Sequence, residues 1–100
     1  MTRKIGIALL GCGRVAQHYA KIFGLIDSQS YEILGCCDVD FSKAESLSKS
    51  LKSKSFTDYK TMLDAINPDL ILILTPSGMH YQHSKIALER GVHVLVEKPI

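Results

Sequence analysis

A glycine-rich turn, Gly11-Cys12-Gly13-Arg14-Val15-Ala16, directly follows an apolar run and opens an amphipathic segment. A buried strand, a tight glycine turn and then a helix form the usual cradle for a dinucleotide pyrophosphate. Gly11 allows the tight turn, Gly13 lets phosphates approach the backbone, and Ala16 allows close packing of helix on strand. The helix N-terminus then presents unpaired N–H groups and a partial positive charge to the anion.

An acid at the expected distance supports this interpretation. Asp38 lies 22 residues after Ala16, close to the roughly 20 expected for the acid that binds an adenosine ribose. A carboxylate repels a 2′-phosphate and no arginine follows it, so NAD is favoured over NADP. Arg14 is the contrary feature, because its guanidinium could reach the pyrophosphate or a 2′-phosphate. The alternative is a structural strand–turn–helix, with Asp38 an ordinary strand-end acid.

Length and composition indicate one small globular domain. The chain has 100 residues, of which 46% are hydrophobic and 22% charged. A net charge of +2 without a basic cluster gives no reason to expect a nucleic-acid partner. No apolar stretch approaches the roughly 18 residues that span a bilayer, and no signal peptide is recognisable. We therefore expect no membrane partner and a cytoplasmic location.

The cysteines are predicted to be structural. Cys12, Cys36 and Cys37 have no Cys-x-x-Cys spacing, which argues against a zinc site and a disulfide framework. Cys36 and Cys37 are neighbours in an expected strand, so their side chains should point to opposite faces of the sheet. Both are expected to be buried as small apolar residues, with Cys12 a small turn residue.

Apolar runs alternate with amphipathic segments along the chain. Strands are predicted at residues 4–10, 31–37, 54–57, 70–74 and 92–96. Helices are predicted at residues 14–25, from a cap at Asp40 or Ser42 to Leu51, from a cap at Thr57 or Asp58 to Ile66, and at 81–90. The apolar helix faces are predicted to be Val15, Tyr19, Ile22, Phe23 and Ile26 in the first helix and Phe41, Ala44, Leu47 and Leu51 in the second.

This alternation of buried strands and helices predicts an α/β fold. It indicates a doubly wound parallel sheet of the Rossmann type with right-handed crossovers and strand order 3-2-1-4-5. Ligands of such sheets bind beyond the carboxyl ends of the strands, where the strand order reverses. The glycine turn, Asp38, residues 75–80 and the pair Glu97-Lys98 all follow strands at that edge.

Three motifs carry a resemblance to a known family: Gly11-Cys12-Gly13-Arg14, Thr75-Pro76-Ser77-Gly78-Met79-His80, and Gly91-Val92-His93-Val94-Leu95-Val96-Glu97-Lys98-Pro99. Together they resemble the Gfo/Idh/MocA family, and the third is close to a family signature. The resemblance spans almost the whole chain. It implies a nicotinamide-dependent oxidoreductase that acts on a sugar, a nucleotide sugar or a cyclitol.

The resemblance also implies a larger protein. Family members have an N-terminal Rossmann domain and a C-terminal α/β domain that completes the substrate pocket. Residues 1–100 are therefore expected to be the N-terminal part of an NAD(P)-binding Rossmann domain, without that substrate domain. We expect the full-length protein to be a homo-oligomer and the 100-residue chain alone to be inactive.

The resemblance assigns roles at two strand ends. Thr75, Pro76 and Ser77 are expected along the nicotinamide half of the cofactor, where proline stiffens the backbone. His80 follows them and is expected to cap the next helix or to contact the cofactor. The remaining histidines, His18, His83 and His93, are expected to be packed or surface residues.

The resemblance makes Lys98 the predicted catalytic residue; without it, Glu97 and Lys98 would be interpreted as an exposed pair after a strand. The Lys98 ammonium group would stabilise the alkoxide that develops as a secondary alcohol loses a hydride to nicotinamide. Glu97 would pair with a cation or contact the nicotinamide riboside. The Lys98–Pro99 bond is expected to be cis, a geometry accessible before proline.

Two other functions are compatible with this fold. A non-catalytic NAD(H)-binding sensor would need no lysine at the nicotinamide end, so Glu97-Lys98-Pro99 favours the enzyme. A different enzyme class on the same fold, such as a methyltransferase or a short-chain reductase, is the third possibility. A short-chain reductase needs a Tyr-x-x-x-Lys pair and is set aside on the premise that this chain has none, and methyltransferases usually lack Glu-Lys-Pro after the fifth strand.

Overall fold

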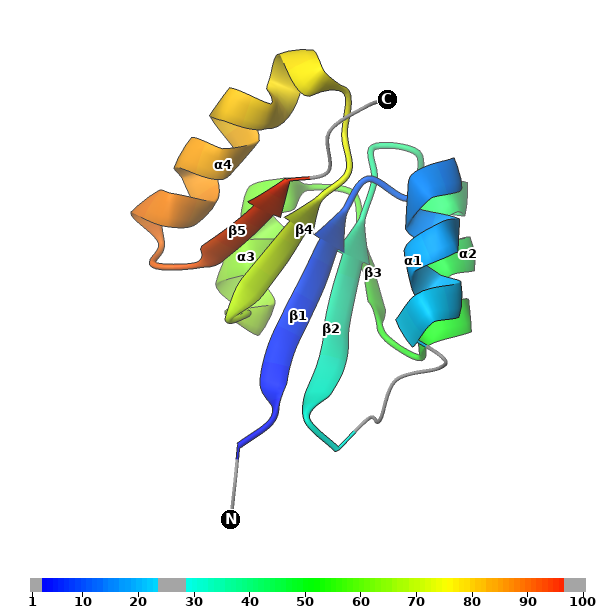
Figure 1. Ribbon diagram of the computed structural model, residues 1–100. Helices are drawn as coiled ribbons and strands as arrows, with labels where there is room; N and C mark the ends of the chain where they lie inside the picture. Colours follow the sequence, from blue (N-terminus) through cyan, green and yellow to red (C-terminus); the bar gives the residue numbers. More distant parts are fainter. Residues whose placement is uncertain (1–2, 24–28, 97–100) are drawn as a thin grey trace.

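The protein folds as a five-stranded parallel sheet with two helices on each face (Figure 1). In this computed structural model, residues 3–23 and 29–96 are described. In chain order the elements are β1 (Ile5–Leu10), α1 (Arg14–Phe23), β2 (Tyr31–Cys37), α2 (Phe41–Leu51), β3 (Lys54–Phe56), α3 (Tyr59–Ile66), β4 (Leu70–Ile73), the 3-10 helix η1 (Ser77–Met79), α4 (His80–Glu89) and β5 (His93–Val96). The strand order β3-β2-β1-β4-β5 confirms the predicted Rossmann topology.

The central strand β1 brings three strand ends level with one another. Leu10 pairs with Cys37 of β2 on one side and with Ile73 of β4 on the other. The ladder continues beyond the strands, because the Gly11 N–H donates to the Cys37 carbonyl at 2.8 Å and the Leu74 N–H donates to the Leu10 carbonyl at 2.8 Å. The turns that follow β1, β2 and β4 therefore meet at one edge of the sheet.

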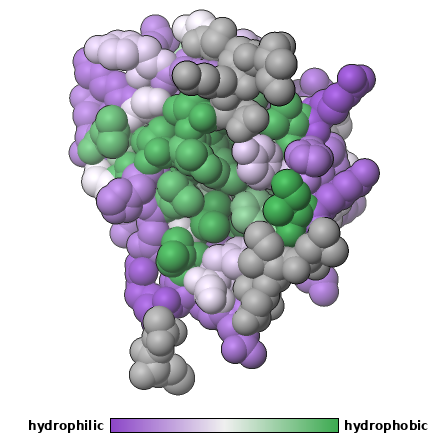
Figure 2. Space-filling model, in the orientation of Figure 1, coloured by the Kyte–Doolittle hydropathy of each residue, from purple (hydrophilic) through white to green (hydrophobic). Residues whose placement is uncertain are grey.

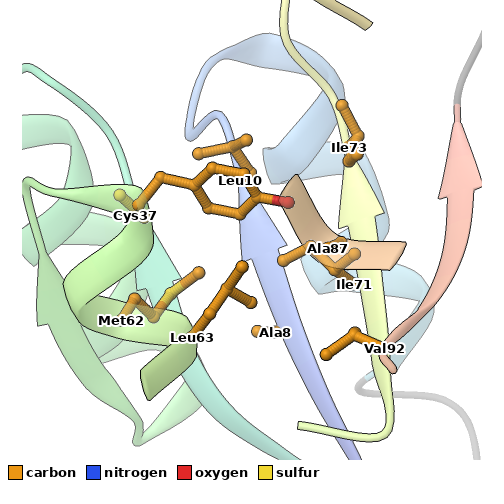
Figure 3. Packing of buried hydrophobic residues seen from close by; sticks show 10 residues of the cluster. Ala8, Leu10, Cys37, Met62, Leu63, Ile71, Ile73, Ala87 and Val92 are labelled. Atoms are coloured by element: carbon orange, nitrogen blue, oxygen red, sulfur yellow. The ribbon is translucent and has the colours of Figure 1, made fainter. Parts of the chain in front are cut away.

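Two hydrophobic layers enclose the sheet. The layer beneath α3 and α4 is shown in Figure 3, and its buried members include Ala8, Leu10, Cys37, Met62, Leu63, Ile71, Ile73, Ala87 and Val92. The layer beneath α1 and α2 contains Ile7, Leu9, Cys12, Ala16, Cys36, Ala44, Leu47 and Leu72. Cys36 and Cys37 therefore point to opposite faces and are both buried, as predicted.

The apolar faces of the first two helices are partly mispredicted. Val15 and Ile22 were placed on the packed face of α1 but are 43% and 37% exposed. The residues that pack are Ala16, Tyr19, Ala20 and Phe23. Tyr19 and Phe23 therefore pack as predicted, and the small residues Ala16 and Ala20 complete the i, i+3, i+4, i+7 face in place of Val15 and Ile22. Phe41, at the start of α2, is likewise 58% exposed. Ile26 lies outside the described residues.

Aspartates cap the second and third helices. The Asp40 carboxylate accepts a hydrogen bond from the Ser42 N–H at 3.0 Å, and the Asp58 carboxylate accepts one from the Thr61 N–H at 2.9 Å. Asp40 and Asp58 are therefore the caps, rather than Ser42 and Thr57. Each carboxylate satisfies an N–H that the first helical turn leaves unpaired.

One face of the sheet is covered less completely near β4 and β5. Leu95 is 51% exposed, and Leu70 and Leu74 are only partly buried at the margin of the α1–α2 layer. Hydrophobic side chains gather in the middle of the molecule in Figure 2, which has the orientation of Figure 1. None of the helices formed by the described residues has the length and apolar character that crossing a membrane requires.

Asp69 joins the amino ends of β1 and β4. Its hydrogen bonds lead us to expect a loss of stability in acid. Its carboxylate accepts hydrogen bonds from the Arg3 guanidinium at 2.6 and 3.0 Å and from the Gly6 N–H at 2.7 Å. The bonds from Arg3 and Gly6 lower the pKa of Asp69 below its ordinary value of 3.8. The stabilisation is present above that ordinary value and is lost as pH falls through the lower folded-state pKa.

Asp69→Asn should therefore weaken the dependence of the free energy of unfolding on pH, measured with urea between pH 7 and pH 2. Glu32→Gln is the matched control, because Glu32 is an exposed acid on β2. Equal slopes for Asp69→Asn and the unsubstituted protein would contradict this role.

Candidate functional site

A cleft of about 460 Å³ opens at the carboxyl edge of the sheet. Five of the predicted site residues line it: Gly11, Gly13, Asp38, Thr75 and Pro76. They come from the turns after β1, β2 and β4, which the strand pairing holds level. The cleft therefore lies where a doubly wound sheet binds its ligands.

The glycine turn requires its first glycine for shape and leaves open space at its second. Gly11 has a φ of +96°, and a Cβ there would lie 3.0 Å from the Leu74 carbonyl carbon and 3.1 Å from its oxygen. A Cβ on Gly13 would meet nothing within 4 Å. α1 begins at Arg14, so its unpaired first N–H groups follow the turn directly. This arrangement suits an anion that approaches the main chain.

Asp38 faces the glycine turn. One carboxylate oxygen, Oδ2, accepts a hydrogen bond from the Cys12 N–H at 2.8 Å, and Oδ1 accepts one from the Asp40 N–H at 2.9 Å. A carboxylate offers about four acceptor positions. Asp38 therefore retains capacity for hydroxyl donors of a ligand in the cleft that it lines.

Two histidines hold Thr75 across the cleft from Asp38. The Thr75 carbonyl can only accept, so His80 Nε2 carries a proton and donates to it. His83 Nδ1 lies 2.9 Å from the Thr75 hydroxyl oxygen. The Tyr59 hydroxyl donates to the His83 carbonyl at 2.8 Å, and the Tyr59 and His83 rings meet edge to face with centroids 5.3 Å apart. The end of β4 is thereby fixed by α4 and α3.

Burial favours the neutral forms of three side chains that line the cleft, Tyr59, Cys12 and His83. It raises the pKa of Tyr59 to about 12, so this side chain acts as a hydroxyl donor. It also raises the pKa of Cys12, whose thiol donates to the Cys37 carbonyl at 3.3 Å and is not a nucleophile at neutral pH. Burial, together with the nearby His80, lowers the pKa of His83.

The lowered pKa of His83 predicts a second pH dependence. The folded state disfavours the protonated imidazole, so stability is full above the ordinary value of 6.5 and falls as pH drops through the lower folded-state pKa. His83→Asn keeps a polar group near Nδ1 but cannot be protonated, so its free energy of unfolding should vary less between pH 7.5 and 5. His93→Asn changes an exposed histidine on β5 and should retain the dependence. An unchanged pH profile in His83→Asn would refute this assignment.

The other predicted residues lie beside the cleft or outside the described part of the chain. Arg14 and Val15 begin α1 and are exposed, and Ser77 begins η1. His80 is the first residue of α4 rather than its cap, which is Met79, and its side chain acts on the site through Thr75. The predicted catalytic Lys98, Glu97 and the Lys98–Pro99 bond lie outside the described residues.

Lys43, Tyr59 and His83 are among the cleft residues that the sequence did not identify. His83 is three residues after His80, a spacing that places both on one helical face. Tyr59 follows the Asp58 cap, and Lys43 lies in the first turn of α2 after Asp38. These spacings could have indicated the three residues as candidates. The contact between Tyr59 and His83, however, depends on how α3 packs against α4.

Setting aside a short-chain reductase on the sequence motif alone is wrong, because Tyr81 and Lys85 do have the Tyr-x-x-x-Lys spacing. Both residues instead line a shallow groove on the outer surface of α4. Neither lines the cleft that contains the glycine turn. The pair therefore does not occupy the position at which such an enzyme would use it.

The sequence of this chain is similar to those of known oxidoreductases. A family model described as an oxidoreductase family with an NAD-binding Rossmann fold matches residues 5–100. D-glucoside 3-dehydrogenase from Escherichia coli K12 is 33% identical over 94 residues, which cover 93% of this chain and 26% of that protein. Glucose-6-phosphate 3-dehydrogenase from Bacillus subtilis 168 is 33% identical over 98 residues, which cover 98% of this chain and 26% of that protein.

Solved structures show the same fold. The WlbA dehydrogenase from Chromobacterium violaceum, crystallised with NADH and UDP-GlcNAcA, is similar with a TM-score of 0.91 and 31% identity over 98% of this chain and 28% of that one. Scyllo-inositol dehydrogenase from Lactobacillus casei, with bound NAD(H) and scyllo-inositol, gives a TM-score of 0.85 and 28% identity over 97% of this chain and 28% of that one. The chain spans about a quarter of the length of the curated relatives it matches.

Proposed function

Since this chain belongs to the Gfo/Idh/MocA family of oxidoreductases, we propose that it binds the cofactor of an NAD-dependent dehydrogenase acting on a secondary alcohol of a sugar, nucleotide sugar or cyclitol. The observation that carries this proposal is the cleft in which the glycine turn, Asp38 and Thr75 converge. The relatives described above are named for glucosides, sugar phosphates and inositols, which supports this substrate class.

The residues of the cleft fit NAD. The space that a Cβ on Gly13 would occupy is open, which allows a diphosphate to approach the main chain beside the start of α1. Asp38 has acceptor capacity left for the adenosine-ribose hydroxyls, and its charge opposes a 2′-phosphate. Thr75 and Pro76 would contact the nicotinamide half. When bound, NAD supplies the hydride acceptor.

Lys98 is the proposed catalytic residue, with Glu97 beside it. Both follow β5, whose last residue Val96 pairs with Ile73 at the same edge of the sheet as the cleft. The lysine ammonium would donate to the substrate oxygen and stabilise the alkoxide as the hydride leaves. A second α/β domain would complete the substrate pocket in a full-length homo-oligomeric protein of the cytoplasm.

Binding and turnover test this proposal separately. We expect the chain to bind NADH, measured by the change in nicotinamide fluorescence, and the full-length protein to reduce NAD with a substrate of the proposed class. Lys98→Met in the full-length protein should keep NADH binding and lower kcat by about 100-fold or more. Absence of NADH binding would refute the proposal. Binding without turnover on any polyol or sugar would favour the non-catalytic NAD(H) sensor instead.

A further inference from the structure

We propose that Asp38 positions the glycine turn, in addition to receiving the adenosine ribose. Its carboxylate joins the turn after β1 to the start of α2, so that binding of a diphosphate depends on Asp38 even when the ribose hydroxyls are absent. The ligand part of this inference rests on the proposed function, whereas the joining of the two segments rests on the hydrogen bonds alone.

The hydrogen bonds at the ends of β1 and β2 support this role. Oδ2 of Asp38 accepts from the Cys12 N–H at 2.8 Å, and Oδ1 accepts from the Asp40 N–H at 2.9 Å. The preceding Cys37 carbonyl accepts from the Gly11 N–H at 2.8 Å and from the Cys12 thiol at 3.3 Å. Three donors of the glycine turn therefore bind two consecutive residues at the end of β2.

The turn is held on its other side as well. The Cβ position of Gly11 lies 3.0 Å from the Leu74 carbonyl carbon and 3.2 Å from the Thr75 nitrogen. The turn therefore fits between the ends of β2 and β4. The Asp38 carboxylate thus supplies a side-chain acceptor for the main chain of this turn.

Burial explains why this bond matters. Cys12 is only 2% exposed. Removal of the Asp38 carboxylate would therefore leave the N–H of a buried residue without its hydrogen-bond acceptor. An unpaired polar group at such a site is unfavourable, and the turn is expected to move toward solvent to pair it. That movement would displace the Gly13 amide region from which a diphosphate would be bound.

This double role has a consequence for cofactor specificity. A neutral residue at position 38 removes the charge that opposes a 2′-phosphate, and Lys43 lines the same cleft as a potential cation for it. The same substitution also releases the glycine turn. Asp38→Ser should therefore weaken NAD binding without giving comparably tight NADP binding.

Amide hydrogen exchange tests the joining of the segments without any ligand. In Asp38→Ser, the Cys12 and Asp40 amides should exchange at least about ten-fold faster, because their acceptor is gone. Asp38→Asn keeps one oxygen and should protect one of the two amides, as a partial rescue. Asp58→Asn is the charge-matched control, because its carboxylate caps α3 and binds Thr61 rather than the turn. Unchanged exchange of Cys12 and Asp40 in Asp38→Ser would overturn the inference.

Calorimetric titration with ADP and 2′,3′-dideoxy-ADP tests the effect on binding. Asp38→Ser should weaken both ligands relative to Asp58→Asn, the dideoxy compound by at least about five-fold. An effect on ADP alone would mean that Asp38 contacts only the ribose, and would overturn the positioning role. If the unsubstituted protein binds neither nucleotide, the proposed function and the binding part of this inference fail together. The exchange rates still decide whether the carboxylate holds the turn.

Discussion

Gly11→Ala is expected to lower the free energy of unfolding by about 1–3 kcal/mol through backbone strain alone. The residue has a φ of +96°, which L-residues with a Cβ rarely adopt. The added Cβ would also lie 3.0 Å from the main chain at Leu74, so the turn must shift. We therefore expect weaker NAD binding as well as lower stability, measured by urea unfolding and by NADH fluorescence titration.

Gly13→Ala is the matched variant, because it separates the shape of the turn from its access to a ligand. A Cβ at Gly13 would meet nothing within 4 Å, and its φ is not positive. Stability should stay within about 0.5 kcal/mol of the unsubstituted protein. NADH affinity should fall by at least about ten-fold, because the Cβ occupies the approach of the phosphates. Unchanged NADH affinity in Gly13→Ala would contradict the placement of the diphosphate.

Ile71→Ala should have the largest effect on stability, with a loss of about 2–5 kcal/mol in the free energy of unfolding. Ile71 is fully buried in β4, between Ala8 of β1 and Val94 of β5, beneath the α3–α4 layer (Figure 3). The loss is a large share of the roughly 5–15 kcal/mol that stabilises a typical domain. Urea or thermal unfolding measures it directly.

Leu95→Ala removes the same class of side chain from a half-exposed position on β5. It should cost less than about 1 kcal/mol, since much of that surface already contacts water. Equal losses for Ile71→Ala and Leu95→Ala would show that the packing differs from the layers described above. Because Ile71 does not line the cleft, its folded variant should bind NADH normally.

The fold could be predicted because its determinants are local. Uniformly apolar strands, helix caps and the glycine turn occur in an order that only a doubly wound sheet accommodates well. The helix faces were less predictable, as Val15 and Ile22 show. In α1 the face that packs is set by where Ala16 allows close approach, and this depends on the sheet rather than on the periodicity of the helix.

The site was predictable where strand ends decide it. Gly11, Asp38 and Thr75 each follow a strand, so the strand order alone brings them to one edge. Tyr59 lies on α3 and His83 on α4, and their contact depends on how these two helices pack against each other. The sequence pattern does not specify how two helices pack, so the contacts by which Tyr59 and His83 hold Thr75 could not be predicted.

An NMR titration of the chain with NAD measures the location of the diphosphate most directly. Saturating NAD should shift the backbone amides of Gly11, Gly13 and Asp38 most strongly, followed by Thr75, and leave the outer groove at Tyr81 and Lys85 unchanged. Shifts confined to that outer groove, or no shifts at the end of β1, would contradict cofactor binding at the glycine turn.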